Sequence, residues 1–264
     1  PDFFSPEPEV FSPISSARFL QPEVFSPGFS KGDSMSENTI EPIAILWDLD
    51  GTLIDSATYH FEGWRDMLAS QGVAYTYDDF LAHLGIRNDL FLKQYLGPDL
   101  PEAELTRLAL VKEEAYRSKV RTNGLNLLPG AEAWLRRVRA NGWKQALASS
   151  APRPNIDVAF EVIESFGLLD AHVSAEEVAH GKPFPDVFLA AAKKLEVPIH
   201  RCIVVEDAPL GIEAARRAGM KVIGVLTTHT ELEADLVVNT LEDLDDESFL
   251  GLLQESELSV QTRA

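Results

Sequence analysis

Asp48 and Asp50 lie two positions apart, directly after the apolar run at residues 43–47, and Gly51 follows them. In an extended strand such residues point to the same side, so both carboxylates face one centre, while a glycine lets the backbone turn away sharply. Two carboxylates so close resist joint ionisation unless they share a proton or a cation lies between them. Carboxylate oxygens are ligands that Mg²⁺ prefers, although a solvated turn after a strand would also explain this segment alone.

Three later segments also place polar side chains after apolar runs or beside prolines. Ser149 follows a short apolar run and could hydrogen-bond a phosphate oxygen through Oγ and its backbone N–H, or simply cap a helix. Lys182 precedes two prolines that fix the backbone, so its ammonium could act as a fixed counter-charge, or lie at the surface. Glu206 and Asp207 follow another apolar run, where paired acids bind a metal or cap a helix.

These four segments complement one another. Each has an ordinary structural explanation, but four unrelated reasons for one sheet to carry such side chains at its strand ends are improbable. Together they provide a nucleophile, an acid or base, hydrogen-bond donors to a phosphate, and metal ligands. Enzymes that catalyse phosphoryl transfer by positioning and electrostatics require these groups. The residues therefore predict phosphoryl transfer with Asp48 as the nucleophile.

The elements that must position these residues are predicted from the pattern of apolar positions. From residue 43 onward, short apolar runs typical of strands alternate with amphipathic stretches whose apolar positions recur at three and four. This alternation predicts an α/β fold, a Rossmann-like doubly wound parallel sheet with helices on both faces. The predicted strands are residues 43–47, 145–148, 171–174, 202–205, 222–225 and 236–238, and the later helices are 131–139, 187–195 and 210–218.

An all-helical insert interrupts the alternation after the first strand. Helical spacing without a convincing strand extends over residues 57–127, in the segments 59–71, 77–84, 89–95 and 102–120. We therefore expect a core domain from residues 40–56 and 128–250, a helical cap domain at 57–127 and a C-terminal tail at 251–264. An insert that leaves and re-enters the sheet domain there can act as a lid over the end of the first strand.

Residues 1–34 differ from the rest in composition. They are rich in Pro, Ser and Phe, and the hexapeptide Pro-Glu-Val-Phe-Ser-Pro occurs at 8–13 and again at 22–27. Met35 follows directly and could be the natural start, so we expect a disordered tail or a segment added upstream of that start. A short docking motif is the alternative.

Composition limits the class of partner. A formal charge of −19 argues against nucleic acid, whose recognition needs clustered Lys and Arg, but a small phosphorylated metabolite remains compatible because one divalent cation can reverse the local field. No apolar run is long enough to span a membrane and no secretory signal is recognisable, so we expect a cytoplasmic protein that binds no membrane. We also expect a monomer. Cys202 cannot form an internal disulfide, and its apolar neighbours favour a buried thiol over a reactive one.

The four motifs resemble, in this order, those of the haloacid dehalogenase superfamily, and the likeness extends over nearly all of residues 42–244. The insert position and residues 59–64, Tyr-His-Phe-Glu-Gly-Trp, resemble the helical-cap branch that contains β-phosphoglucomutases and small sugar-phosphate phosphatases. The segments 148–151 and 206–215 are similar to the same branch. The motifs themselves are Asp48-Leu49-Asp50-Gly51-Thr52, Ser149, Lys182 with Pro183, and Glu206-Asp207.

The resemblance implies a role for each of these residues. Asp48 would attack phosphorus to form an aspartyl-phosphate, and Asp50 would protonate the leaving oxygen and then activate the acceptor. Ser149 and Lys182 would hold the transferring phosphate. The implied Mg²⁺ ligands are Asp48, the backbone carbonyl of Asp50 and Asp207, with Glu206 nearby or acting through water.

The choice of reaction within this branch depends on the cap, where His60, Arg87 and Lys112 are the candidate substrate contacts. A phosphatase transfers the phosphoryl group to water, and a mutase transfers it to a sugar hydroxyl. His60 and Lys112 resemble the mutases, whereas the position of the mutase arginine is Asn88, with Arg87 one residue earlier, which is closer to the sugar-phosphate phosphatases.

We therefore predict a Mg²⁺-dependent phosphatase that acts on a small phosphorylated metabolite, such as a sugar phosphate. A β-phosphoglucomutase-type phosphomutase is the alternative, and a non-catalytic binding or regulatory protein of the same fold is the alternative from another class. Asp50 disfavours two other reactions of the superfamily, because dehalogenases and phosphonate hydrolases lack an aspartate at that position.

Overall fold

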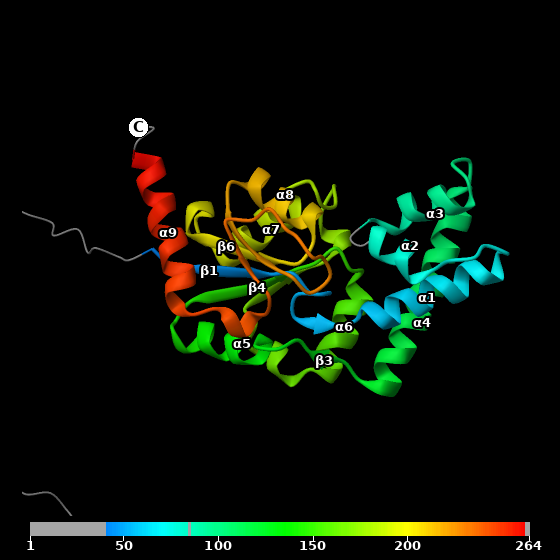
Figure 1. The fold of residues 1–264 in the computed structure, drawn as a ribbon, viewed down its shortest axis with the longest axis horizontal. Coiled ribbons are helices and arrows are strands. Elements are labelled where there is room, and N and C mark those ends of the chain that lie inside the picture. Colours follow the sequence, from blue (N-terminus) through cyan, green and yellow to red (C-terminus); the bar gives the residue numbers. More distant parts are fainter. Residues whose placement is uncertain (1–40, 84–85, 262–264) are drawn as a thin grey trace, which may run out of the picture. The chain divides into compact units, whose positions relative to one another are not determined.

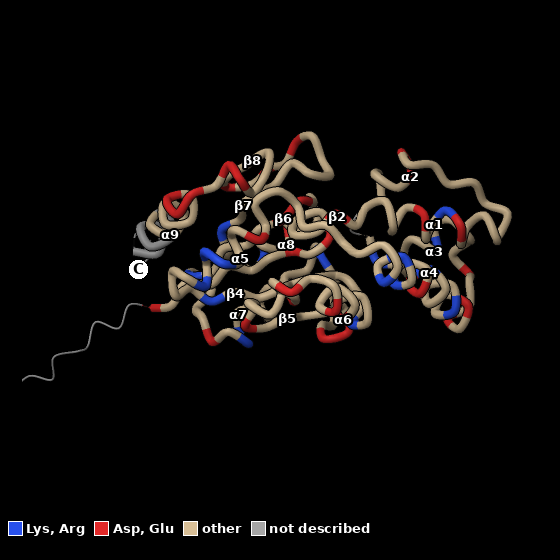
Figure 2. Tube along the Cα trace, turned by 90° about the horizontal axis from the view of Figure 1, so that it is seen from below, with Lys and Arg blue, Asp and Glu red and all other residues tan. Residues whose placement is uncertain are grey.

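The structure is a computed structural model, and it describes residues 41–83 and 86–261, with side chains as far as residue 254. The predictions for the tail at 1–34 and for residues 262–264 lie outside the described residues. Within the described ranges, no helix is both long and apolar enough to cross a membrane. Figure 2 shows acidic positions on the α/β elements and on the helices of the insert alike, so the negative charge is not gathered on one element.

All six predicted strands are confirmed, and they form one parallel sheet in the order β5-β4-β1-β6-β7-β8. β1 lies in the middle, and the chain adds β4 and β5 on one side of it before it returns to add β6 on the other (Figure 1). In such sheets ligands bind outside the carboxyl ends of the strands, where the strand order reverses. The strands are β1 (Ala44–Trp47), β4 (Lys144–Ala148), β5 (Ala171–Val173), β6 (Cys202–Glu206), β7 (Lys221–Val225) and β8 (Leu236–Val238).

Helices cover both faces of the sheet, as the predicted fold class requires. Alternate side chains of β1 separate into two apolar clusters, because successive residues of a strand point to opposite faces: Ile45 and Trp47 pack on one side, and Ala44 and Leu46 on the other. α5 (Ala131–Ala140), α6 (Arg153–Val162) and α9 (Asp246–Gln261) cover the first face, and α7 (Asp186–Leu195) and α8 (Pro209–Ala218) the second. Short 3-10 helices lie at Glu164–Leu168, Ala175–Glu177, Ile199–Arg201 and Leu241–Asp243.

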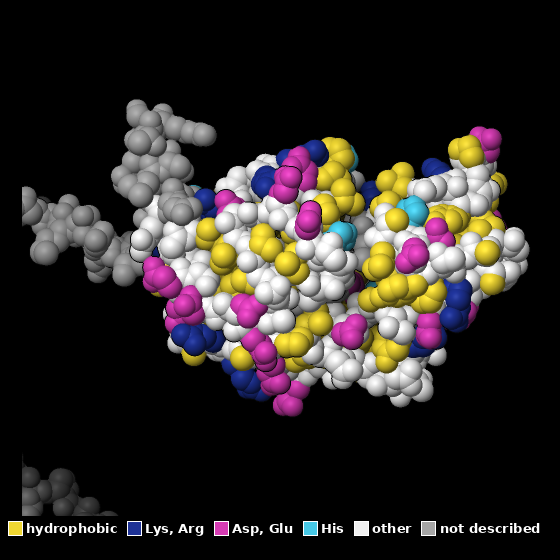
Figure 3. Space-filling model, in the orientation of Figure 1, with side chains coloured by type: hydrophobic (Ala, Val, Ile, Leu, Met, Phe, Trp, Pro, Cys, Tyr) yellow, Lys and Arg dark blue, Asp and Glu magenta, His cyan; other side chains and the backbone are white. Residues whose placement is uncertain are grey.

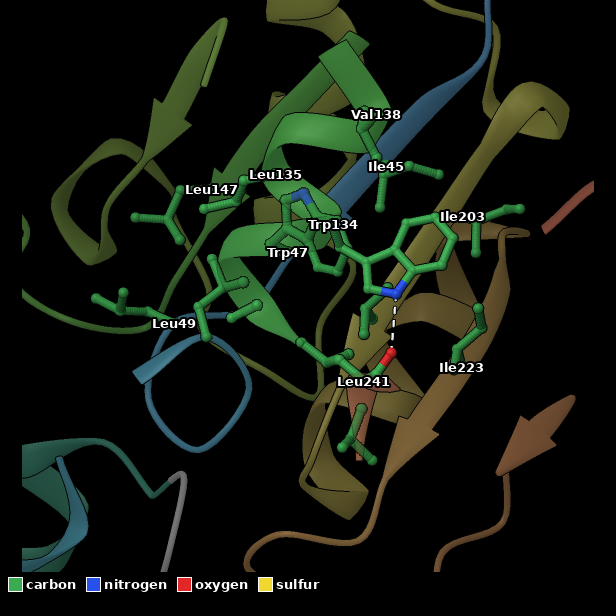
Figure 4. Packing of buried hydrophobic residues seen from close by; sticks show 14 of the residues in the cluster. Ile45, Trp47, Leu49, Trp134, Leu135, Val138, Leu147, Ile203, Ile223 and Leu241 are labelled. Carbon is green, nitrogen blue, oxygen red and sulfur yellow. Dashed lines mark hydrogen bonds between the residues drawn. The ribbon is translucent and has the colours of Figure 1, made fainter. Parts of the chain in front are cut away.

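The centre of the first apolar cluster is a tryptophan on α5. Trp134 packs with Trp47, Ile45 and Ile203 of the sheet (Figure 4). Its indole N–H donates to the backbone carbonyl of Leu241 at 2.8 Å, so the large ring is buried without an unpaired donor.

The helical insert lies between two short strands that the sequence did not predict. β2 (Ile54–Asp55) and β3 (Asn126–Leu127) pair antiparallel, so the points where the chain leaves and re-enters the α/β part are held together. The expectation of helix throughout 57–127 is therefore wrong at its end. The insert's helices are α1 (Ala57–Ser70), α2 (Tyr77–Ala82), α3 (Asn88–Leu96) and α4 (Glu102–Asn123), and Leu84 at the predicted end of the second lies outside the described residues.

The four helices of the insert share their own apolar cluster. Trp64, Leu68, Phe91 and Leu105 are among its buried members, and they come from α1, α3 and α4. Because this cluster is separate from the two that flank the sheet, the insert has its own packed interior. We call α1–α4 the cap and the sheet with its covering helices the core.

Two helices were missed by the periodicity reading. α6 begins at Arg153, directly after Pro152, and has Pro154 in its first turn, and α9 runs through the boundary expected at residue 250. Leu252 and Leu253, on the far side of that boundary, are buried in the same cluster as Trp134, so the helix belongs to the packed core. Cys202 is buried as predicted, and burial raises the pKa of its thiol to about 12.

Candidate active site

Lys182 binds two of the predicted acidic residues at once. Its ammonium donates to Oδ1 of Asp48 at 2.5 Å and to Oε1 of Glu206 at 2.7 Å, and all three side chains are buried. Burial disfavours a charged ammonium, but Asp48 and Glu206 outweigh it and raise the pKa of Lys182. A permanent positive charge is therefore held between the ends of β1 and β6.

Glu206 is positioned by contacts to both of its carboxylate oxygens. Oε1 accepts from Lys182, while Oε2 accepts from the backbone N–H groups of Asp207 and Ala208, each at 2.7 Å. A Cβ at Gly211 would collide with this carboxylate, so only glycine lets the first turn of α8 lie against it. Since every near contact is made within the protein, Glu206 holds Lys182 and the loop after β6 in place.

Asp207 is held by hydroxyl groups from two other loops. Thr52 Oγ1 donates to Oδ1 at 3.3 Å, and Thr228, which follows β7, donates to Oδ2. Gly51 has a left-handed φ of 86°, and a Cβ there would meet Oδ2 of Asp207. The turn after Asp50 thus needs glycine for both its conformation and its close approach to Asp207.

Asp48, Glu206 and Asp207 are a buried cluster whose ligand atoms lie within 4.8 Å of one another. Burial raises the pKa of Asp48 to about 7, and burial together with Glu206 and Asp48 raises the pKa of Asp207 well above its usual value. Three carboxylates face one ammonium, so the cluster retains protons unless a further cation is present. Oxygen donors in this number and at this spacing fit a divalent cation.

Asp50 points away from this cluster and toward the cap. Its Oδ1 accepts a hydrogen bond from Ser56 Oγ at 2.5 Å and lies 3.1 Å from His60 Nε2, on the first helix of the cap. Burial alone would favour the neutral acid, but His60, through electrostatic attraction and its hydrogen bond, and the hydrogen bond from Ser56 lower the pKa of Asp50. The two carboxylates two positions apart therefore have different surroundings.

Ser149 lies at the end of β4, and its surroundings correct one expectation. Its backbone N–H donates to the carbonyl of Val173 at 3.1 Å as part of the sheet, so this amide does not serve as a hydrogen-bond donor to a phosphate. Oγ accepts from the N–H of Ala151 at 3.0 Å, which orients the hydroxyl to donate its own hydrogen. Only the hydroxyl remains as the Ser149 contact for a phosphate.

His60 links Asp50 to a buried lysine of the cap. Lys112 Nζ lies 2.9 Å from His60 Nδ1, and the imidazole stacks on the ring of Tyr116 at 4.1 Å. Because an ammonium only donates, Nδ1 accepts and Nε2 carries the proton that is donated to Asp50. The cap thus supplies a hydrogen-bond donor to the carboxylate that follows β1.

Lys112 has a counter-ion beside it in the sequence. Its ammonium donates to Oε1 of Glu113 at 2.9 Å, and both side chains are almost completely buried. Glu113 also accepts from Asn88 at 2.8 Å and, through Oε2, from Asn155 of α6 at 2.6 Å. Asn155 in turn accepts from Arg117 at 2.9 Å, so one core amide is bound on both sides by α4.

Arg87 lies at the rim, between the cap and the loop that carries Lys182. Its Nε lies 3.0 Å from Oδ1 of Asp89, in a pair whose side chains are 52% and 37% exposed. The side-chain carbons of Arg87 also pass close to Gly181 of the core, where an added Cβ would be 3.0 Å from Cδ. Arg87 is therefore paired and partly in solvent.

A cavity of about 630 Å³ brings all nine predicted site residues together. The face drawn in Figure 3 is hollowed between the core and the cap. Apolar cap residues such as Trp64, Leu105 and Ala109 line it as well. The predicted residues that line it are Asp48, Asp50, His60, Arg87, Lys112, Ser149, Lys182, Glu206 and Asp207.

Four residues that the sequence reading missed complete this arrangement, namely Ser56, Glu113, Asn155 and Thr228. Glu113 had a local signal, since an acid next to Lys112 on a helix could have been suspected as its partner. The other three reach their partners only through the fold, and nothing in their spacing indicated it.

Comparison with known proteins gives one family. Residues 44–219 match the family model described as haloacid dehalogenase-like hydrolase. Among solved structures, a β-phosphoglucomutase from Clostridium difficile matches with a TM-score of 0.70 and 29% identity, over 82% of this chain and 99% of that one.

Curated relatives include both kinds of reaction. β-Phosphoglucomutase of Bacillus subtilis (strain 168) is 34% identical over 76% of this chain and 91% of its own length. Fructose-1-phosphate phosphatase of Escherichia coli (strain K12) is 33% identical over 69% of this chain and 95% of its own length. The chloroplastic protein SUPPRESSOR OF QUENCHING 1 of Arabidopsis thaliana is 36% identical over 71% of this chain, but this chain spans only 18% of that protein.

Proposed function

Because the chain belongs to the haloacid dehalogenase-like hydrolase family, we propose that it is a Mg²⁺-dependent phosphatase that hydrolyses a small phosphorylated metabolite, a sugar phosphate, through an aspartyl-phosphate intermediate. One observation carries this proposal. The two carboxylates after β1 have different partners, since Asp48 is bound by Lys182 in the core and Asp50 by Ser56 and His60 toward the cap. One is suited to attack and the other to proton transfer.

In the first step a carboxylate oxygen of Asp48 attacks phosphorus, and the bond between phosphorus and the leaving oxygen breaks. The ammonium of Lys182 and the hydroxyl of Ser149 hold the phosphoryl oxygens. Asp50 gives its proton to the leaving oxygen. The surroundings of Asp50 favour its ionised form when no phosphate is bound, but an arriving dianion raises its affinity for a proton.

In the second step water attacks the phosphorus of the aspartyl-phosphate. Asp50, now ionised, accepts the proton of that water, and the bond between phosphorus and Asp48 breaks to release inorganic phosphate. His60 keeps Asp50 oriented through the hydrogen bond from Nε2. After the two steps together, every residue is again in its starting protonation state.

The metal would be held by Asp48, Asp207 and the backbone carbonyl of Asp50. A bound Mg²⁺ would neutralise charge on these carboxylates and on the phosphate oxygens, which otherwise repel the nucleophile. Glu206 makes its close contacts to Lys182 and to two backbone amides, so we assign it to positioning, or to a contact through water.

A phosphomutase is the second candidate, because a β-phosphoglucomutase is among the relatives and His60 and Lys112 occupy mutase-like positions. We favour the phosphatase since Asn88 donates to Glu113, and Arg87 is paired with Asp89 at the rim. A non-catalytic binding protein of the same fold is disfavoured by the intact set of acids, Ser149 and Lys182. A cytoplasmic location, a monomeric state and the lack of nucleic-acid or membrane partners stay predictions.

The experiment is a screen of phosphorylated sugars and nucleotides for phosphate release with and without Mg²⁺. Alongside it, β-glucose 1-phosphate is supplied with catalytic glucose 1,6-bisphosphate while both glucose 6-phosphate and free phosphate are followed. Release of phosphate without isomerisation supports the proposal. Isomerisation that outruns phosphate release would instead establish the mutase.

A further inference from the structure

The basic side chains around the cavity are already neutralised. Four Lys or Arg residues line it in the described part of the chain, and each has a carboxylate at 3.0 Å or less. Lys182 serves the core end, where phosphate and metal would lie. The cap side has Arg87, Lys112 and Arg117, whose partners are Asp89, Glu113 and Glu114 in the same order.

Among these pairs, Lys112 and Glu113 lie deepest. Their side chains are 3% and 5% exposed, whereas those of Arg87 and Asp89 are 52% and 37% exposed, and an ion pair in contact with solvent is weak and screened. Lys112 is also linked to the proposed reaction, since its ammonium contacts His60, which contacts Asp50. Lys112 is therefore the most buried of the cap-side charges that could attract an anion.

Other groups besides Lys112 stabilise the ionised carboxylate of Glu113. Asn88 donates to Oε1 and Asn155 donates to Oε2, so the carboxylate has three donors from three different elements. Burial would favour the neutral acid, but Lys112, His60 and the hydrogen bond from Asn155 outweigh it and lower the pKa of Glu113 to about 2. At neutral pH the pair with Lys112 has no net charge.

From this geometry we propose that Glu113 is a specificity-determining residue, which cancels the charge of Lys112 and so restricts the substrate to monophosphates whose remaining part is uncharged. The proposal rests on the proposed function, because it assumes that the reacting phosphate lies at Asp48 and Lys182. A second phosphate or carboxylate on the substrate would enter the cap side, where the described residues offer no buried Lys or Arg without a carboxylate partner. Losing its hydration without such a partner is unfavourable.

The test compares one phosphate with two on the same sugar. Hydrolysis of 4-nitrophenyl phosphate in excess Mg²⁺ is the reporter, and inhibition constants are measured for glucose 6-phosphate against glucose 1,6-bisphosphate and for fructose 1-phosphate against fructose 1,6-bisphosphate. In the unaltered enzyme the bisphosphate should inhibit no better than its monophosphate. In Glu113→Gln the carboxamide no longer neutralises Lys112, so the ratio of the two inhibition constants, monophosphate to bisphosphate, should shift at least about tenfold in favour of the bisphosphate.

Further variants separate charge from damage to the fold. Asn88→Lys adds an ammonium near Glu113 and should shift the ratio of inhibition constants in the same direction. Because it leaves no buried charge unpaired, it replaces Glu113→Gln in the test if that variant does not fold. Adding Lys112→Met to Glu113→Gln should abolish the gain. Glu104→Gln makes the same charge change on the same helix, but Glu104 pairs with exposed Arg107 outside the cavity, so its ratio should stay unchanged.

The outcomes are distinct. An active enzyme whose ratio stays constant in both Glu113→Gln and Asn88→Lys overturns this inference and leaves the phosphatase proposal standing. A bisphosphate that already binds tenfold more tightly to the unaltered enzyme overturns it as well. If the folded, Mg²⁺-loaded enzyme neither hydrolyses the reporter nor binds any of the competitors, the proposed function fails, and the inference fails with it.

Discussion

Lys182 Nζ lies 2.5 Å from Oδ1 of Asp48, although 134 positions separate the two residues in the sequence. The lysine follows β5 and the aspartate ends β1, which are separated by β4 in the sheet. The contact places a positive charge beside the proposed nucleophile, where an approaching phosphate dianion would otherwise meet only carboxylates.

Asp48→Asn should lower phosphate release at least about a thousandfold while the fold is retained, because a carboxamide has the same shape but is too weak a nucleophile to form the acyl-phosphate. Lys182 keeps its bond to Glu206 in this variant, so the site should not collapse. Steady-state phosphate release measures the loss of activity, and circular dichroism checks that the fold is retained. Residual activity within tenfold of the unaltered enzyme would rule out the covalent mechanism.

Removal of the metal should abolish activity, and added Mg²⁺ should restore it. Asp207→Asn should raise the Mg²⁺ concentration needed for half-maximal activity, because one anionic oxygen ligand is lost. Titration of Mg²⁺ into chelator-treated enzyme measures both. Asp157→Asn, an exposed aspartate paired with Arg153, is the matched control and should leave the requirement unchanged. Full activity in excess chelator would contradict the metal-dependent mechanism.

Gly211→Ala should lower activity strongly, although the substitution adds only one methyl group. The added Cβ would collide with the Glu206 carboxylate, which would have to move and release its hold on Lys182. We expect a loss of about 1–3 kcal/mol in the free energy of unfolding and of about a hundredfold in kcat. Gly251→Ala on α9, where a Cβ meets nothing within 4 Å, is the control. Normal turnover by a folded Gly211→Ala enzyme would show that the position of Glu206 does not matter.

Glu113 should make the fold sensitive to acid. Its pKa is lowered from 4.5 to about 2, so ionised Glu113 stabilises the fold above about pH 4.5, and that contribution is lost as the pH falls toward 2. The loss should reach about 2 kcal/mol by pH 3. Denaturant unfolding from pH 5.5 to 3 measures it.

Two variants test whether Glu113 causes that acid sensitivity. Glu113→Gln should flatten the pH dependence, since a carboxamide does not titrate in this range. Lys112→Met should make the loss smaller, because Lys112 is the charge that lowers the pKa of Glu113 most, and without it that pKa rises toward its value in the unfolded chain. An unchanged slope in both variants would place the acid sensitivity elsewhere.

Arg87→Ala should weaken substrate use without changing the reaction. Its pair with Asp89 is partly exposed to solvent, so the free energy of unfolding should fall by no more than about 1 kcal/mol. If the substrate is a monophosphate, Arg87 orients its hydroxyls or outer rim, and kcat/KM should fall moderately. A loss of a few kcal/mol in transition-state binding, together with loss of isomerisation, would indicate a distal phosphate and therefore a mutase.

Much of the fold could be predicted from the sequence because its signals are local. The apolar runs of β1 and β6 and the three-and-four spacing of α4 and α5 depend only on neighbouring residues, and each run ends in the acids that meet at one edge of the sheet. β2 and β3 were missed because two-residue strands have no period to detect. α6 was missed because its first turn contains prolines, which are typical of turns as well as of helix starts.

The sequence by itself determined the positions of the catalytic-type residues, since the carboxyl ends of parallel strands meet wherever those strands pair. Only the tertiary structure decided what each side chain faces. The Ser149 amide is taken by β5, Asp50 turns to His60, and Glu113 meets Asn88 and Asn155 from two other elements. The contact of Glu113 with Asn155 depends on how the cap packs on α6, and side chains distant in sequence carry no periodic signal of the partner that they will reach.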